Sequence, residues 1–255
     1  MPTVDIVIRS HAKDFAWLRH CLSAVRRRCT GFRRVIVVVP RRSASRLTRY
    51  GIEADSIVRC PDYAEDYLGQ QVTKVLADRL TDADLIAHLD SDCVVRRLMI
   101  PADLMDGAGR PRMLYTPDRH FRRGVPWRTA TERFLGHPVS CDYMRRQPLV
   151  YPRWLYGELR EHSRREHGME LSGYIQARRP LGFSELNALG AYAHRHHRGA
   201  FAWTLHPSPA YDATLTRVFW SWAGVTPAAR RELRRLDQED TAPLGTGDGD
   251  VPAES

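Results

Sequence analysis

Short apolar runs alternate with helical patterns over the first 95 residues. The β-branched runs at 4–8 and 35–39 and the apolar run at 85–89 have the length and composition of buried strands, and a weaker run follows at 56–59. Between them, residues 14–28 and a stretch that begins at Gly69 repeat apolar side chains at helical spacing. Strands that alternate with helices predict an α/β fold with a mostly parallel, Rossmann-like central sheet and flanking helices.

The pattern loosens after Arg96. Residues 126–170 carry tryptophan, tyrosine and arginine without a clear period. Apolar spacing and turn signals predict further short elements, namely helices at 101–105, 183–192 and 227–236 and strands at 113–116 and 201–205. We expect residues 1–236 to form a single domain, followed by a disordered acidic tail at 237–255.

The fourth predicted strand ends in Asp90 and Asp92, with Ser91 between them. In a doubly wound sheet the first and fourth strands are neighbours at the switch point, so residues 9–11 should emerge beside this acid pair. Two nearby carboxylates repel each other, and a hard cation such as Mg²⁺ or Mn²⁺ can neutralise them and hold substrate phosphates. A solvated turn after a strand is the alternative interpretation.

The helix that begins near Gly69 should project from the same edge of the sheet. Its residues Gln70, Gln71 and Lys74 share one face. Lys74 can meet a diphosphate there, or the whole face can be solvated.

Composition limits the class of protein. No apolar segment approaches the roughly 20 residues that a bilayer span requires, and residues 1–10 lack a signal-peptide pattern, which predicts a cytoplasmic protein without a transmembrane segment. The five cysteines form no Cys-x-x-Cys pair, so neither a disulfide framework nor a zinc site is indicated. The net charge is +9, and because residues 237–255 hold six acids and no base, the rest of the chain carries +15. Such a basic surface attracts phosphates, anionic polymers or nucleic acid.

Four stretches together resemble bacterial and phage glycosyltransferase-like proteins with the GT-A fold. They are Val-Ile-Arg-Ser-His near the start, Gly-Gln-Gln-Val-Thr-Lys before the acid pair, His-Leu-Asp-Ser-Asp-Cys-Val around it, and Gly-Phe-Ser-Glu-Leu-Asn-Ala-Leu-Gly-Ala-Tyr late in the chain. The resemblance spans most of residues 3–225. It implies a metal-dependent hexosyltransferase that uses a nucleotide-diphosphate-sugar, first among them a UDP-sugar. Residues 1–95 would then form the nucleotide-binding half and 96–236 the acceptor half.

The resemblance also assigns roles to residues. Asp90 and Asp92 would hold a divalent metal, Mn²⁺ or Mg²⁺, and His206 would complete its shell, with His194, His196 and His197 as competitors. The donor would be bound by the residues around both predicted turns and on the helix after Gly69: Arg9, Ser10, His11, Gln71, Lys74, Asp90 and Ser91.

Catalysis requires a base for the acceptor hydroxyl, if the enzyme inverts configuration. Glu185 lies in the first turn of a predicted helix whose N-cap is Ser184, and it is our candidate for that base, with Asp92 as the other catalytic residue. Glu185 can instead be an acid placed favourably against the helix dipole. The acceptor is not identified; glycans, small molecules and modified DNA are all open.

Three rival functions stay open. A phosphotransferase of the haloacid-dehalogenase type also uses Asp-x-Asp, but there the motif normally follows the first strand. A nucleotidyltransferase on a similar fold would need a glycine-rich first loop, which this sequence lacks. A nucleic-acid-binding protein without catalysis would account for the basic charge and scattered aromatic residues.

Overall fold

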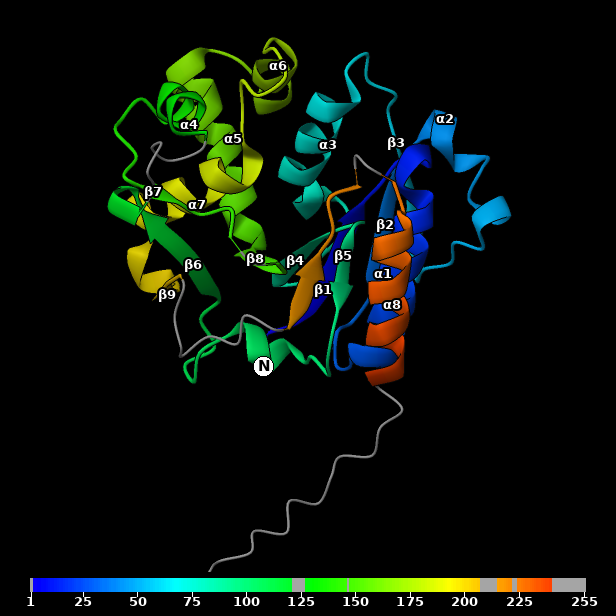
Figure 1. Ribbon diagram of the computed structural model, residues 1–255. Helices are drawn as coiled ribbons and strands as arrows, with labels where there is room; N and C mark the ends of the chain where they lie inside the picture. The colour runs from blue at the N-terminus through cyan, green and yellow to red at the C-terminus, as the bar shows by residue number, and fades with distance from the viewer. Residues whose placement is uncertain (1, 121–126, 146, 207–214, 222–223, 240–255) are drawn as a thin grey trace, which may run out of the picture.

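The fold is built on a central sheet with strand order β3-β2-β1-β4-β8 (Figure 1). The computed structural model describes residues 2–120, 127–145, 147–206, 215–221 and 224–239. The strands of the central sheet are β1 (Val4–Arg9), β2 (Val35–Pro40), β3 (Ser56–Cys60), β4 (Leu85–Asp90) and β8 (Leu149–Pro152). The pairs β1–β2, β2–β3 and β1–β4 are parallel and β4–β8 is antiparallel, which confirms the predicted mostly parallel sheet.

Helices cover both faces of this sheet (Figure 1). Their bounds are α1 (Phe15–Arg28), α2 (Arg41–Ala44), α3 (Asp66–Val75), α4 (Arg128–Leu135), α5 (Arg153–His167), α6 (Leu171–Gln176), α7 (Glu185–His196) and α8 (Pro227–Glu239). Because side chains alternate along a strand, β1 supplies both cores: Ile6 and Ile8 pack with α1 and α8, whereas Val7 packs with α3, α5, α6 and α7.

Two smaller sheets complete the described structure. Strand β5 (Cys93–Val95) begins directly after Asp92 and pairs antiparallel with β10 (Thr216–Val218). The other sheet has the order β7-β6-β9, formed by Cys141–Asp142, Arg112–Pro117 and Ala202–Leu205. The acid pair therefore lies at a sharp turn between two strands, which restricts where both carboxylates can point.

The end of the described chain is tied to its beginning. The buried Arg28 guanidinium at the end of α1 donates to the carbonyl oxygens of Val95 (2.7 Å) and Leu236 (2.6 Å). These bonds hold α8 beside α1 and β5, as Figure 1 shows. None of the described helices has the length and apolar character needed to cross a membrane.

Several predicted boundaries shift in the structure. Helix α3 begins at Asp66 rather than Gly69, and the helix predicted at 101–105 is a short 3₁₀ helix, Pro101–Leu104. Helix α8 reaches Glu239, so three residues of the predicted disordered tail are helical, and residues 240–255 lie outside the described chain. The aromatic stretch without a predicted element contains α4, β7, β8 and α5.

Candidate active site

The acid pair lies at the carboxyl end of β4, where β1 ends beside it. Arg9, the last residue of β1, pairs with Asp90, the last residue of β4. The predicted juxtaposition of residues 9–11 with 90–92 is therefore confirmed. The acid pair follows the fourth strand. In a phosphotransferase of the haloacid-dehalogenase type it would follow the first strand.

A buried lysine joins two of the predicted acids. Lys74 Nζ lies 2.7 Å from Asp90 Oδ1 and 3.0 Å from Glu185 Oε1. The Lys74 and Glu185 side chains are 6% and 7% exposed, whereas that of Asp90 is 35% exposed and open to a ligand. The result is a chain of ion pairs, Asp90–Lys74–Glu185, built from β4, α3 and the first turn of α7.

Electrostatics favours the charged forms of Lys74 and Asp90. Burial lowers the pKa of Lys74, but the Asp90 and Glu185 carboxylates raise it more, so the net pKa lies above the ordinary value for lysine. Burial raises the pKa of Asp90. The Lys74 ammonium and the Gln147 amide lower it by more, so the net pKa lies below the ordinary value for aspartate.

Gln147 also hydrogen-bonds to Asp90, a contact that the sequence did not indicate. Its Oε1 accepts the Asp90 backbone N–H at 2.6 Å, and its Nε2 donates to Asp90 Oδ2. The Gln147 carbonyl in turn accepts the Thr216 hydroxyl at 2.6 Å. These bonds fix the orientation of the Asp90 carboxylate.

Asp92 faces another set of groups. Its Oδ2 accepts the Ser221 backbone N–H at 3.0 Å, and its carbonyl oxygen accepts the Phe219 N–H at 2.8 Å. Burial and the charge of Asp90 raise the pKa of Asp92 to about 6, against the Ser221 hydrogen bond, which lowers it. A nearby cation would stabilise the charged form of this carboxylate and lower its pKa.

The residues predicted after β1 are held by acids. Arg9 donates to both oxygens of Asp66, at 3.0 and 2.5 Å, and its side chain is 2% exposed. His11 lies 3.0 Å from Asp14 and 3.7 Å from Asp66. Ser10 is buried. Arg9 and His11 thus border the switch point and contact Asp66, the first residue of α3.

The remaining donor candidates serve as supports in the structure. Gln71 is buried and its Nε2 donates to the Phe183 carbonyl at 2.9 Å, which ties α3 to the segment before α7. Ser91 is buried in the turn between Asp90 and Asp92. A role for either residue toward a donor stays a prediction.

A cavity of about 730 Å³ opens beside this ion-pair chain. Its size suits an organic ligand of moderate size. Its floor holds Lys74, Asp90 and Glu185, and His206 also lines it, whereas Asp92 does not. The other lining residues are Tyr67, Gln70, Gln71, Trp127, Asp142, Met144, Arg145, Gln147, Leu181, Ser184, Leu186, Val218 and Trp220.

The metal assignment stays a prediction. In the described residues no group of three or more His, Cys, Asp or Glu side chains is arranged to hold a metal ion, so Asp90, Asp92 and His206 do not form a ready-made set. Two carboxylates still suit Mg²⁺ where phosphates and water supply the other ligands. Of the competing histidines, His194 bonds the Tyr143 hydroxyl at 3.0 Å and His197 bonds Glu158.

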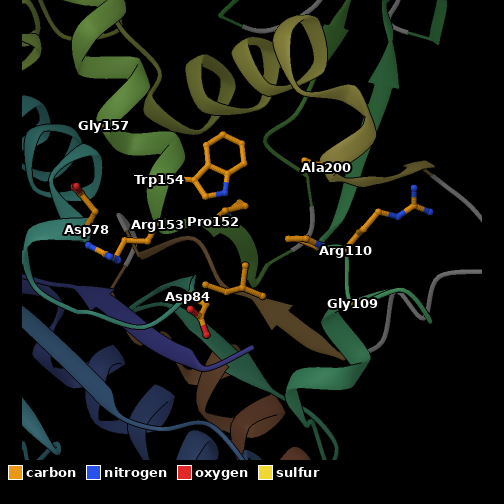
Figure 2. A pocket seen from close by; sticks show the side chains of 11 residues that line it. Asp78, Asp84, Gly109, Arg110, Pro152, Arg153, Trp154, Gly157 and Ala200 are labelled. Atoms are coloured by element: carbon orange, nitrogen blue, oxygen red, sulfur yellow. The ribbon is translucent and has the colours of Figure 1, made fainter. Parts of the chain in front are cut away.

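A second hollow of about 450 Å³ lies near the amino end of β4, at the opposite end of this strand from Asp90. Figure 2 shows Trp154, Arg153 and Asp84 around it, at the amino end of β4 and the start of α5. Asp84 is held by the backbone and hydroxyl of Thr3, both at 2.8 Å. Open α/β sheets bind ligands at the carboxyl ends of their strands, which favours the cavity beside Asp90.

A scan against protein-family models and a search of curated proteins both found no match for this chain.

Proposed function

We propose that the protein is a metal-dependent glycosyltransferase of the GT-A type, which moves a sugar from a nucleotide-diphosphate-sugar to an acceptor hydroxyl. The observation that carries the proposal is the Asp90–Lys74–Glu185 ion-pair chain at the floor of a cavity beside the switch point of the sheet. This is the edge where α/β folds bind nucleotides. The short strand β5 starts directly after the acid pair, so both aspartates lie in the turn that follows β4.

Lys74 suits the leaving diphosphate. An ammonium group has three N–H donors, and Asp90 and Glu185 take two of them. The third can face the diphosphate oxygen, which gains negative charge as its bond to the sugar breaks. In the buried site this interaction is stronger than it would be in water.

Glu185 suits the proton of the acceptor. In the inverting reaction the acceptor oxygen forms a bond to the anomeric carbon while the bond from that carbon to the diphosphate oxygen breaks. The hydroxyl proton passes to Glu185, whose Oε1 already accepts Lys74 and whose second oxygen can take it. A divalent cation bound by Asp90 and Asp92 would add charge stabilisation for the leaving diphosphate.

Donor binding is the direct test. We expect UDP-, GDP- or dTDP-sugars with Mn²⁺ to raise the melting temperature by about 5 °C when present at roughly 100 times Kd. The measurement is thermal unfolding with each nucleotide-sugar, with and without Mn²⁺. If none of them shifts the transition under either condition, the proposal is wrong.

Variants then separate the roles of the acids. Asp92→Ala should abolish transfer while the protein still folds. Glu185→Gln keeps an oxygen that accepts Lys74 but cannot take a proton, so turnover should fall about a hundredfold or more with donor binding retained. The matched control is Glu158→Gln, a half-exposed acid that pairs with His197 outside the cavity. Wild-type turnover in Glu185→Gln would remove the base role.

A further inference from the structure

The cavity combines a charged floor with an apolar rim. We define the apolar rim as the side chains of Tyr67, Trp127, Met144, Leu181 and Trp220, all of which line the cavity. Leu181 and Trp220 are 63% and 67% exposed, and Met144 is 37% exposed. Large apolar side chains that stay exposed together around one cavity are typical of a ligand-binding surface.

Two members of the apolar rim have a strained backbone. In the described part of the chain, Trp127 (φ 63°) and Leu181 (φ 70°) are the non-glycine residues with positive φ. This conformation is unfavourable for bulky side chains and, where it persists, is often found at functional sites. Both residues also border one smaller hollow of about 350 Å³, so the apolar rim is continuous between them.

The aromatic members of the apolar rim favour a flat ligand. The rings of Tyr67 and Trp127 are near parallel, with centroids 6.5 Å apart and an interplanar angle of 22°. Such an offset pair presents ring faces and edges on which another aromatic system can pack.

The charge of the cavity lining favours an uncharged acceptor beside the donor. Among the described residues, its lining contains two cations, Lys74 and Arg145, against three acids, Asp90, Asp142 and Glu185. Arg145 also pairs with Asp142, which leaves the floor with an excess of negative charge in a chain whose net charge is +9. A donor diphosphate at Lys74 would add further negative charge, so an uncharged acceptor suits the remaining space better than an anionic polymer.

We propose that the acceptor of the transfer is an uncharged hydroxylated aromatic compound, whose rings pack on the apolar rim while its hydroxyl reaches Glu185. The chemical class follows from the apolar rim and the charge of the lining, whereas the role as acceptor rests on the proposed glycosyltransferase function. Beside a bound donor diphosphate, this proposal disfavours anionic glycans and DNA as acceptors.

Calorimetric titration without any nucleotide-sugar tests the chemical class. The probes are 2-naphthol, an uncharged aromatic alcohol at neutral pH, and maltose, a hydroxyl-rich compound without an aromatic ring. We expect 2-naphthol to bind more tightly than maltose. Tighter binding of maltose, or no detectable binding of 2-naphthol, would overturn the proposal.

Variants locate the binding site. Trp127→Asn and Leu181→Asn remove apolar contacts, and asparagine tolerates positive φ, so both variants should fold. Each should raise the Kd for 2-naphthol about tenfold. The matched controls Trp154→Asn and Leu98→Asn change exposed apolar residues (44% and 67%) that do not line the cavity, and they should leave the Kd unchanged.

The outcomes keep the two proposals apart. Equal effects in rim and control variants would overturn the aromatic site. Since Leu181 is mostly exposed, its variant keeps the test decisive even if Trp127→Asn fails to fold. Binding of 2-naphthol together with no response to any nucleotide-sugar would support the aromatic site and reject glycosyl transfer.

Discussion

Lys74 holds together two carboxylates that would otherwise repel each other. Its ammonium lies within 3.0 Å of both Asp90 and Glu185, and it is almost fully buried. Lys74→Met should therefore lower the free energy of unfolding by about 3 kcal/mol, because it leaves buried charge without a partner. Chemical denaturation at neutral pH measures this loss.

Two further variants make the Lys74 prediction specific. Lys13→Met removes the other lysine of the chain, which is exposed, and should leave stability unchanged. The double variant Lys74→Met/Glu185→Gln removes one of the uncompensated charges and should recover part of the lost stability. A single Lys74→Met variant as stable as the wild type would contradict the importance of the ion-pair chain.

Asp5 should make stability depend on pH at the other end of β1. The carboxylate is buried and accepts hydrogen bonds from Arg33 (2.9 and 2.8 Å) and from the hydroxyl of Thr81 (2.5 Å). Burial raises the pKa of Asp5, but these partners lower it more, so the net pKa lies below the ordinary 3.8. The stabilisation is then complete above the unfolded pKa and is lost as the pH falls through the lower folded pKa.

Asp5→Asn tests this dependence. We expect the variant to be less stable than the wild type by about 2 kcal/mol near neutral pH, and the difference to shrink below about pH 4. Urea unfolding of both proteins at about pH 7 and about pH 3 measures the two differences. An equal deficit at both pH values would show that charge is not the cause.

Sequence could identify the site residues that regular elements place, and not those that loops place. Asp90, Lys74 and Glu185 follow from a strand end and two helices, whose geometry is local. Gln147 lies before β8 in an irregular segment, and nothing in its neighbourhood indicates that its amide will reach Asp90. The pairing of Arg9 with Asp66 was not predicted, because α3 begins earlier than the apolar pattern indicated, and a role of Arg9 toward the donor stays a prediction.

At the scale of elements, α7 is positioned by a close approach at Gly190. A Cβ atom added there would lie 2.7 Å from Tyr143 Cγ and closer still to its Cβ. Gly190→Ala should therefore lower stability by about 1–3 kcal/mol, although alanine favours helices. Transfer should fall as well, because α7 carries Glu185 in its first turn.

Gly157→Ala in α5 is the matched control for that close approach. A Cβ atom there would meet only the far end of Arg160, at 3.8 Å. Without a clash, helix propensity should dominate and stabilise the protein by about 0.5–1 kcal/mol. Thermal unfolding of both variants decides the matter, and similar shifts in the two proteins would contradict the packing argument.

The elements that the sequence could predict are those with a clear run or repeat of apolar side chains. Strands β1, β2 and β4 are mostly apolar runs, and α1 and α8 repeat apolar side chains at helical spacing, so each was found within a few residues. The segment from α4 to α5 was missed. Its core residues, such as Phe134, Tyr151 and Tyr156, are aromatic side chains buried by tertiary contacts, and arginines beside them hide the pattern.

At the scale of the whole molecule, the net charge of the chain and the charge of the cavity lining differ in sign. The chain carries +9 overall, yet the described residues that line the cavity include more acids than cations. Any binding of nucleic acid should then take place on the outer surface, through phosphates, and not in the cavity. We expect the affinity for generic duplex DNA to fall at least about tenfold between roughly 50 and 200 mM salt.

Competition distinguishes the two surfaces. If the basic charge is unrelated to the transfer site, saturating nucleotide-sugar or 2-naphthol should leave DNA affinity unchanged, and Lys74→Met should do the same. Fluorescence anisotropy with a labelled duplex, measured over a salt series, gives both results. Displacement of DNA by the small ligands, or a strong sequence preference that survives high salt, would instead make nucleic acid the substrate. If, in addition, no nucleotide-sugar stabilises the protein, the results would support a nucleic-acid-binding protein without catalysis.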